Sequence, residues 1–201
     1  MNRFDIASKN WDQKPLSILI AKSTAQEIQN QIDLTHMDIL DYGCGTGLLG
    51  FALSDNAHSL LGMDDSKGMV EVFNQKAQEC GFENVKAIQH NINDQSLPKK
   101  AFDMIVISMA LHHIKEINSF FKQCQQALKP NGYLCISDLD KEDGTFHAKH
   151  NNDGVEHFGF SEDEIKSLYQ ENGFELICLK PICTVEREIR NYPIFLSIGK
   201  I

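Results

Sequence analysis

A glycine-rich stretch, ILDYGCGTGLLG at residues 39–50, restricts the fold of this chain more than any other feature. An apolar segment of strand length precedes the glycines, and an apolar segment that suits a helix follows them. We therefore expect a strand, a tight turn and a helix, with backbone amides of the turn pointing toward a bound ligand. Two interpretations compete, because Gly45–Gly50 reads G-x-G-x-x-G whereas Gly43–Gly47 reads G-x-G-x-G.

The carboxylates around the glycines favour the second interpretation. A dinucleotide would place its pyrophosphate against the first glycines and the helix start, where Asp41 and Asp64 would repel it. Gly43 and Cys44 would also be surplus before the first glycine of the dinucleotide motif. S-adenosylmethionine carries a sulfonium and an ammonium group and no phosphate, so a carboxylate attracts it. Asp64 could then accept hydrogen bonds from both ribose hydroxyls.

Strand and helix patterns alternate through most of the chain. Strands are expected over residues 37–42, 59–63, 85–90, 102–108 and 133–137. Helices are expected over residues 16–32, 48–53, 69–77 and 117–128, with a turn at 129–132. This alternation predicts an α/β fold with a mostly parallel sheet and helices on both faces.

The end of the chain departs from this alternation. Ser161 and Glu164 form a capping-box pattern for a helix that ends at Gly173. Two strand-like segments, roughly residues 174–184 and 193–199, follow without a helix between them. We expect them to form an antiparallel pair at the sheet edge, which completes a seven-stranded sheet.

Four stretches, in chain order, carry a resemblance to a known family: LDYGCGTGLLG, GMDDSKGMV, LPKKAFDMIVISMALHHI and ALKPNGYLCISD. They resemble the successive motifs of the class I S-adenosylmethionine-dependent methyltransferases. The nearest branch includes the ubiquinone and menaquinone biosynthesis C-methyltransferases and many small-molecule methyltransferases. FDIASKNWDQKP, near the start, is more weakly similar to the helical cap of that branch. The resemblance implies a three-layer, Rossmann-like methyltransferase sandwich with S-adenosylmethionine as cofactor.

The resemblance also implies cofactor-binding residues. Those expected to hold the methionine part belong to the glycine loop: Asp41, Gly43, Cys44, Gly45, Thr46 and Gly47. Those expected beside the ribose and adenine follow the second and third strands: Asp64, Asp65, Ser66, Asn91, Ile92 and Asn93. Ser108 and Met109 are expected near the reacting methyl group. Trp11 either closes over the cofactor from the cap or packs within the first helix.

Residues 138–160 form a long polar segment without periodicity. Such loops are uncommon inside a compact domain and are often functional. This one leaves the carboxyl end of the fifth strand, the ligand edge of such a sheet. We expect it to cover the cleft mouth and to contribute His147 and His157 as catalytic residues, because histidine can remove a proton near neutral pH. A solvated surface loop is the alternative.

Other histidines receive different interpretations. His112 and His113, which follow the fourth strand, are expected to be structural or adjacent to the cofactor. His147 and His150 have a spacing that could suit a metal only in a helical context, which the segment lacks. No metal is therefore expected.

Length and charge restrict the partners. The 201 residues are expected to form one methyltransferase domain, with a helical cap at 1–34, a cofactor-binding core at 35–140, a substrate loop at 141–160 and a C-terminal helix and strand pair at 161–201. The net charge of −9 argues against a nucleic-acid partner. No membrane attachment is expected, because no apolar run is long enough. Six scattered cysteines predict free thiols in the cytoplasm.

The sequence therefore predicts an S-adenosylmethionine-dependent methyltransferase that acts on a small-molecule acceptor. The fourth strand is followed neither by Asn/Asp-Pro-Pro-Tyr nor by Pro-Cys, which disfavours methylation of nucleic-acid bases. Two alternatives stay open. One is a protein that binds S-adenosylmethionine without methyltransferase activity, and the other, less favoured, is a dinucleotide-dependent reductase.

Overall fold

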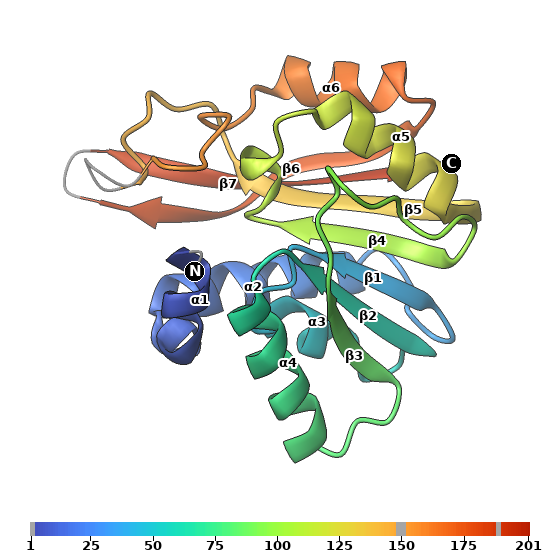
Figure 1. The fold of residues 1–201 in the computed structure, drawn as a ribbon. Coiled ribbons are helices and arrows are strands. Elements are labelled where there is room, and N and C mark those ends of the chain that lie inside the picture. The colour runs from blue at the N-terminus through green and yellow to red at the C-terminus, as the bar shows by residue number, and fades with distance from the viewer. Residues whose placement is uncertain (1–2, 148–151, 188–189) are drawn as a thin grey trace.

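The computed structural model describes residues 3–147, 152–187 and 190–201. Within these ranges a seven-stranded sheet has the order β3-β2-β1-β4-β5-β7-β6 (Figure 1). The mutually parallel strands are β1 (Asp38–Tyr42), β2 (Ser59–Asp64), β3 (Val85–Gln89), β4 (Phe102–Ser108) and β5 (Leu128–Leu139). β7 (Asn191–Lys200) pairs antiparallel with β5 and with β6 (Glu175–Glu186). The predicted sheet, including its antiparallel edge pair, is confirmed.

Helices cover both faces of the sheet (Figure 1). α5 (Ile117–Ala127) and α6 (Glu162–Glu171) lie on one face, and α2 (Pro15–Gln29), α3 (Leu48–Leu53) and α4 (Lys67–Glu79) lie on the other. Phe121 and Tyr169 are fully buried under the first layer, and Ile28 and Phe73 under the second. Each such side chain contributes about 1.5–3 kcal/mol. The predicted three-layer sandwich is confirmed.

The N-terminal segment, residues 3–13, consists of α1 (Arg3–Ala7) and the 3-10 helix η1 (Ser8–Gln13). Asp5 Oδ1 accepts hydrogen bonds from the Ser66 hydroxyl at 2.7 Å and from the Gly68 amide at 3.0 Å. Asp12 forms an ion pair of 2.7 Å with Lys76 of α4. Two carboxylates therefore fix this segment to the start and the last turn of α4.

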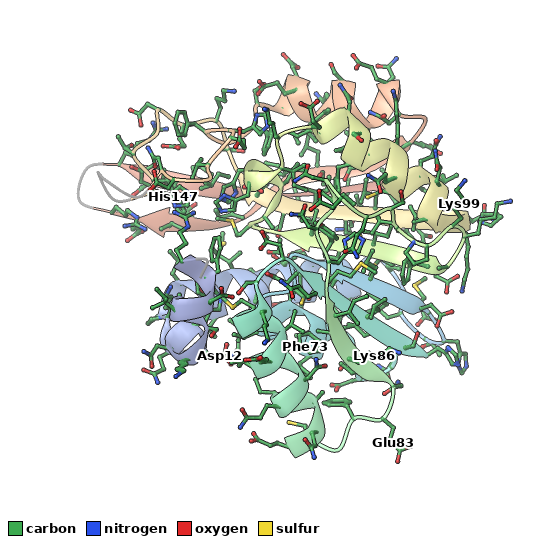
Figure 2. All side chains as sticks on the ribbon, in the orientation of Figure 1. Asp12, Phe73, Glu83, Lys86, Lys99 and His147 are labelled. Atoms are coloured by element: carbon green, nitrogen blue, oxygen red, sulfur yellow. The ribbon has the colours of Figure 1, made fainter. Side chains whose placement is uncertain are left out.

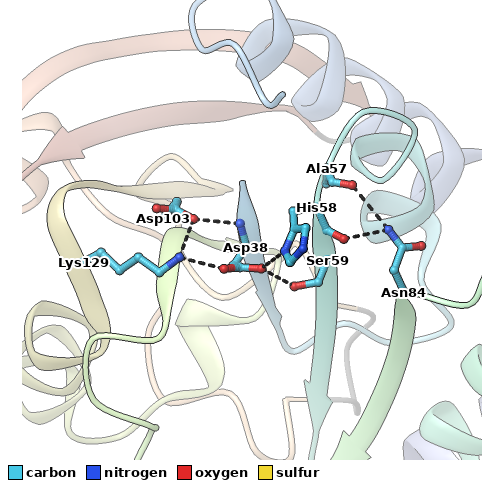
Figure 3. A network of polar contacts seen from close by, with 7 residues as sticks. All are labelled: Asp38, Ala57, His58, Ser59, Asn84, Asp103 and Lys129. Carbon is cyan, nitrogen blue, oxygen red and sulfur yellow. Dashed lines mark hydrogen bonds and ion pairs between the residues drawn. The ribbon is translucent and has the colours of Figure 1, made fainter. Parts of the chain in front are cut away.

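A polar network joins the amino ends of the strands, at the edge opposite the glycine loop (Figure 3). Asp38 accepts from Ser59 at 2.6 Å, from His58 at 2.8 Å and from Lys129 at 2.7 Å, and Lys129 also reaches Asp103 at 2.8 Å. Burial opposes ionisation of Asp38, but these hydrogen bonds outweigh it and hold its pKa well below the ordinary value. The network ties β1, β2, β4 and β5 together.

Some predicted boundaries change. The turn expected at 129–132 is a bulge within β5, since Phe102 pairs with Leu128 and Met104 with Tyr133. Asn131 has a φ of 65°, so the turn chemistry is present although strand pairing continues on both sides. The Ser161–Glu164 capping box is confirmed. In the described ranges, every helix lacks either the length or the apolar character that crossing a bilayer requires.

Candidate active site

A cavity of about 980 Å³ lies at the carboxyl ends of the parallel strands. Residues that follow β1, β2, β3 and β4 line it, together with the N-terminal segment, the start of α2 and the loop after β5. Carboxyl ends of parallel strands meet at one edge, so side chains distant in the sequence converge there. Figure 2 shows His147 and Asp12 at this end of the molecule and Lys99 at the other.

The cavity brings together most of the predicted site residues: Trp11, Asp41, Gly43, Cys44, Gly45, Thr46, Asp64, Asp65, Asn91, Ile92, Asn93, Ser108, Met109 and His147. Gly47, Ser66 and His157 lie outside its lining. Gly47 has a φ of 86° and precedes α3, and Ser66 caps α4 by accepting from the Met69 amide. The Nε2 atom of His157 lies 3.0 Å from the carbonyl oxygen of Ile114.

The glycine loop adopts left-handed conformations that suit glycine. φ is 69° at Gly43 and 53° at Gly45. A Cβ atom at Gly43 would lie 2.6 Å from Cβ of Ala110, so this glycine allows close packing against the segment after β4. At Gly45 the nearest atoms to such a Cβ would be Sδ of Met69 and Nε1 of Trp11, both 4.0 Å away. Gly45 therefore leaves space beside its backbone.

Two carboxyl groups flank the loop, Asp41 buried and Asp64 partly buried. Asp41 is 2% exposed, and its Oδ2 atom has no hydrogen-bond partner among the described residues. Asp64 accepts from the Gly45 amide at 2.8 Å and from the Ser66 amide at 2.9 Å. Burial, followed by the charge of Asp64, raises the pKa of Asp41 to about 7. Burial raises the pKa of Asp64 to about 6. Desolvated carboxyl groups of this kind favour a cationic ligand.

The N-terminal segment covers the loop. The Thr46 hydroxyl donates to Asp12, and the Thr46 carbonyl oxygen accepts from Lys76 Nζ at 2.8 Å. The Trp11 ring lines the cavity, with Nζ of Lys14 3.8 Å from its centroid. The segment therefore contacts the glycine loop and a wall of the cavity at once.

The turn after β3 is held by its own hydrogen bonds. The amide of Ile92, a residue expected beside the ribose and adenine, donates to the Tyr42 hydroxyl at 3.1 Å. The Asn93 amide donates to Oδ1 of Asn91 at 2.9 Å. All three residues of the turn line the cavity.

A cluster of imidazole rings, formed by His112, His113 and His147, also lines the cavity, and we call the part that these rings line the histidine end. The ring centroid of His112 is 4.1 Å from that of His113 and 5.3 Å from that of His147. Nδ1 of His112 lies 2.7 Å from Oδ1 of Asp138, and this pair is almost completely buried. The Nε2 atoms of His112 and His147 are buried without a hydrogen-bond partner among the described residues.

Burial also affects the charge of the cluster. It lowers the pKa of His113 to about 4, with a further contribution from His112. Burial and then the charge of His112 lower the pKa of His147 to about 4. Both rings are therefore neutral at pH 7. Within the described ranges, no group of three or more His, Cys, Asp or Glu side chains could hold a metal ion, and His150 lies outside those ranges.

The loop after β5 is attached to the histidine end. The amides of Glu156 and His157 donate to the His112 carbonyl oxygen at 3.0 and 3.1 Å. Nδ1 of His113 lies 2.5 Å from the Gly154 carbonyl oxygen. The loop lines the cavity through Phe146, His147, Asp153, Gly154 and Glu156. The described part of this loop thus lies at the carboxyl edge of the sheet, as its place after the fifth strand predicts.

Sequence reasoning missed several lining residues. Arg3, Ile20 and Arg187 belong to segments without a motif, so no local signal identified them, and Phe4 was covered only by the weak similarity of residues 4–15 to a helical cap. The contact between His112 and Asp138 did have a signal, because His112 follows β4, Asp138 lies at the carboxyl end of β5, and those two strands are neighbours. Their carboxyl ends therefore had to meet at the same edge.

Known proteins place this architecture in a family. The model of the family described as a methyltransferase domain matches residues 33–173. An uncharacterised methyltransferase of Schizosaccharomyces pombe is 31% identical over 173 residues, which cover 80% of this chain and 61% of the relative. A ubiquinone biosynthesis O-methyltransferase of Histophilus somni is 29% identical, with 74% of this chain and 65% of the relative covered. The chain thus spans less than two thirds of either relative's length.

A solved structure supports the same assignment of fold. An S-adenosylmethionine-dependent methyltransferase from Aquifex aeolicus superimposes with a TM-score of 0.71 at 21% identity, and the match covers 98% of each chain. The matched family model, the glycine loop and the seven-stranded sheet all indicate the same family. The chain belongs to the methyltransferase-domain family and has the class I methyltransferase fold.

Proposed function

We propose that this protein transfers a methyl group from S-adenosylmethionine to a small-molecule acceptor bound at the histidine end of the cavity. The observation that carries the proposal is that two chemically different sets of residues line a single cavity. One set presents carboxyl groups and glycine backbone, and the other presents histidine rings. A volume of about 980 Å³ is at the upper end of the range for small-molecule sites, and accommodates a cofactor beside an acceptor.

The residues of the glycine end fit S-adenosylmethionine. The unpartnered Oδ2 atom of Asp41 suits an ammonium or sulfonium group, and Asp64 suits the ribose hydroxyls. The space beside Gly45 allows ligand atoms to approach the backbone. A pyrophosphate in the same place would face two carboxyl groups, which argues against the dinucleotide alternative.

The bound cofactor supplies an activated methyl group, and the chain's own residues supply orientation and exclusion of water. Orientation of two reactants can contribute about 7–11 kcal/mol. Ser108 is fixed for such a role, because it accepts from the Ser137 hydroxyl at 2.8 Å, which in turn accepts from Thr24 at 3.0 Å. The N-terminal segment, with Trp11, limits the access of water to the glycine end.

Further features support a small-molecule acceptor and a cytoplasmic location. One relative is named for O-methylation in ubiquinone biosynthesis, which is consistent with a small-molecule acceptor. A net charge of −9 disfavours a nucleic-acid substrate. All six cysteines are free thiols, which supports a cytoplasmic location. We infer that residues 1–201 act as one domain, since the described ranges share a single sheet.

Cofactor binding and methyl transfer can be tested separately. Calorimetry should show that S-adenosylmethionine and S-adenosylhomocysteine bind and that NADH does not, because carboxyl groups surround the glycine loop. Incubation of the protein with a metabolite extract and methyl-labelled S-adenosylmethionine should then label a small molecule. Cofactor binding without any labelled product, in extracts from several sources, would favour the binding protein without methyltransferase activity. Tight binding of NADH alone would contradict the cofactor assignment.

Cofactor binding should release protons and strengthen as the pH rises. Asp41, with a pKa of about 7, is largely protonated at pH 6 in the free protein. The ammonium group of S-adenosylhomocysteine favours the ionised carboxylate, so binding at about pH 6 should release up to about one proton and affinity should rise by at most about tenfold per pH unit. Calorimetry in buffers with different ionisation heats measures this release. Asp41→Asn should abolish most of it, and unchanged release in that variant would assign the proton elsewhere.

The raised pKa of Asp41 has the opposite effect on the free energy of unfolding, which should fall as the pH rises. The pKa of Asp41 is raised above its unfolded value of 3.8, so the unfolded chain loses this proton more readily. Its contribution to stability is therefore present at low pH and is lost as the pH rises through the window from about 4 to about 7. Bound cofactor should reduce this loss, because it stabilises the ionised carboxylate in the folded state.

A further inference from the structure

We propose that His112 and Asp138 form the proton-accepting pair of the histidine end, and that the acceptor presents a weakly acidic hydroxyl group to Nε2 of His112. This inference rests on the proposed function, because it assigns a base and an acceptor class to the same methyl transfer. His112 would be the catalytic residue, and Asp138 would be a positioning residue that acts through it.

The geometry fixes the proton on one nitrogen of His112. An ionised carboxylate accepts hydrogen bonds and does not donate them, so the contact of 2.7 Å between Asp138 Oδ1 and Nδ1 places the hydrogen on Nδ1. Asp138 Oδ2 also accepts from the backbone amide of His112 at 3.2 Å, so the carboxylate holds ring and backbone together. In the neutral ring, Nε2 then carries the lone pair and can accept a proton.

The unpartnered nitrogens indicate what the acceptor must offer. Nε2 of His112 and Nε2 of His147 are buried without a hydrogen-bond partner among the described residues. A buried polar atom without a hydrogen bond destabilises the folded protein. Nδ1 of His113 already donates to the Gly154 carbonyl oxygen, so the neutral ring of His113 also has its lone pair on Nε2. An acceptor molecule that brings a hydrogen-bond donor would relieve these costs.

The charges around the cluster favour a hydroxyl whose oxygen becomes negative. The groups that face His112 and its neighbours come from several elements: Asp138 of β5, His113 of η2 (Leu111–His113), His147 and Glu156 of the loop, Arg3 of α1 and Arg187 after β6. After burial and the charge of His112, the charge of Arg3 lowers the pKa of His147, Asp138 opposes it and Arg187 adds to it. The two arginines are thus close enough to stabilise an oxygen that loses its proton.

A base is needed for a hydroxyl acceptor more than for an amine. A neutral amine has a nucleophilic lone pair before it loses a proton, whereas a hydroxyl oxygen becomes a good nucleophile only as its proton leaves. In the proposed step the acceptor oxygen forms a bond to the methyl carbon, and the bond from that carbon to sulfur breaks with its electron pair kept by sulfur. The hydroxyl proton passes to Nε2 of His112 and later to solvent. The products are a methyl ether and a neutral thioether.

The decisive variant is His112→Asn. The asparagine amide can still donate to Asp138, but it has no counterpart of Nε2. His58→Asn is the matched control, because His58 also places Nδ1 2.8 Å from a carboxylate, that of Asp38, at the opposite edge of the sheet (Figure 3). In the extract assay, His112→Asn should lower methyl incorporation by roughly 100-fold or more, whereas His58→Asn should leave it unchanged. Both variants should bind S-adenosylhomocysteine within about twofold of the wild type.

The labelled product tests the acceptor class. Label should be recovered as a methyl group on oxygen. An N-methyl or S-methyl product, or wild-type incorporation by His112→Asn, would overturn the inference while leaving the proposed function standing.

A measurement independent of activity separates the assignment of His112 as the base from the proposed function. Nitrogen-15 spectra of histidine-labelled protein with S-adenosylhomocysteine should show that the neutral form of His112 carries its proton on Nδ1. Asp138→Asn should shift His112 toward the Nε2-protonated form, because the amide can donate to Nδ1. If wild-type His112 instead carries its proton on Nε2, or is doubly protonated at pH 7, the base assignment fails. If the spectra agree but no extract yields a labelled product, the proposed function fails.

Discussion

Gly45→Ala should weaken the binding of S-adenosylhomocysteine by roughly 100-fold. The backbone at Gly45 has a φ of 53°, in which a Cβ atom costs about 1–2 kcal/mol. The new methyl group would also project into the space between Met69 and Trp11, where its nearest neighbours are 4.0 Å away and where we place the cofactor. An inserted group in a filled site costs about 1–3 kcal/mol more. Calorimetry gives the loss directly.

Gly81→Ala is the matched control for this prediction. Gly81 has a φ of 74° at the end of α4, and no atom lies within 4 Å of the Cβ position. The alanine there should lower the free energy of unfolding by about 1–2 kcal/mol, the same backbone cost as at Gly45. Its cofactor affinity should stay within about twofold of the wild type. Thermal unfolding measures the first quantity and calorimetry the second. Equal losses of affinity in both variants would mean that backbone strain, rather than a blocked site, explains the effect.

Asp64→Ala should weaken cofactor binding by roughly 10-fold to 100-fold, since hydrogen bonds to a charged group contribute about 1.5–3 kcal/mol. The structure adds a second cause, because the carboxylate also accepts from the amides of Gly45 and Ser66. Removing it takes a ligand contact and a support of the glycine loop together. The loss in binding free energy, measured by calorimetry with S-adenosylhomocysteine, should therefore exceed the loss in the free energy of unfolding, measured by thermal unfolding.

The neighbouring carboxylate gives the comparison. Asp65 is exposed and lines the rim of the same cavity, so Asp65→Ala should cost less affinity than Asp64→Ala. Asp64→Asn, which keeps one oxygen acceptor, should give an intermediate value. A larger loss in Asp65→Ala than in Asp64→Ala would mean that the ribose contact belongs to the next residue along the chain.

Most of the sheet could be predicted because its signals are local. The strand patterns of β1 and β4 and the capping box at Ser161 each depend on a few consecutive residues. The bulge in β5 could not be foreseen, because a turn-like sequence inside a strand is accommodated only when both flanks pair with β4. The attachment of the N-terminal segment was also hidden, since Asp5 and Asp12 find their partners in α4 and the glycine loop.

Part of the candidate site could likewise be predicted from the sequence, and part could not. The glycine loop and Asp64 were predictable because a motif beside a strand defines them. The three-dimensional arrangement separates His147, which lines the cavity, from His157, which contacts the Ile114 carbonyl oxygen. Nothing in the spacing of these histidines distinguishes them. The contact between His112 and Asp138 requires the strand order, which a single sequence specifies only indirectly.

The lining of the histidine end has a consequence for how specificity diverges. Arg3, Phe4, Ile20 and Arg187 contribute to the cavity, and all lie outside residues 33–173, the stretch that matches the family. On the function proposed above, the proton-accepting pair belongs to the stretch that matches the family, whereas part of the acceptor's surroundings belongs to the flanking segments. Changes in the flanking segments would then alter the shape and charge around the acceptor without removing the base.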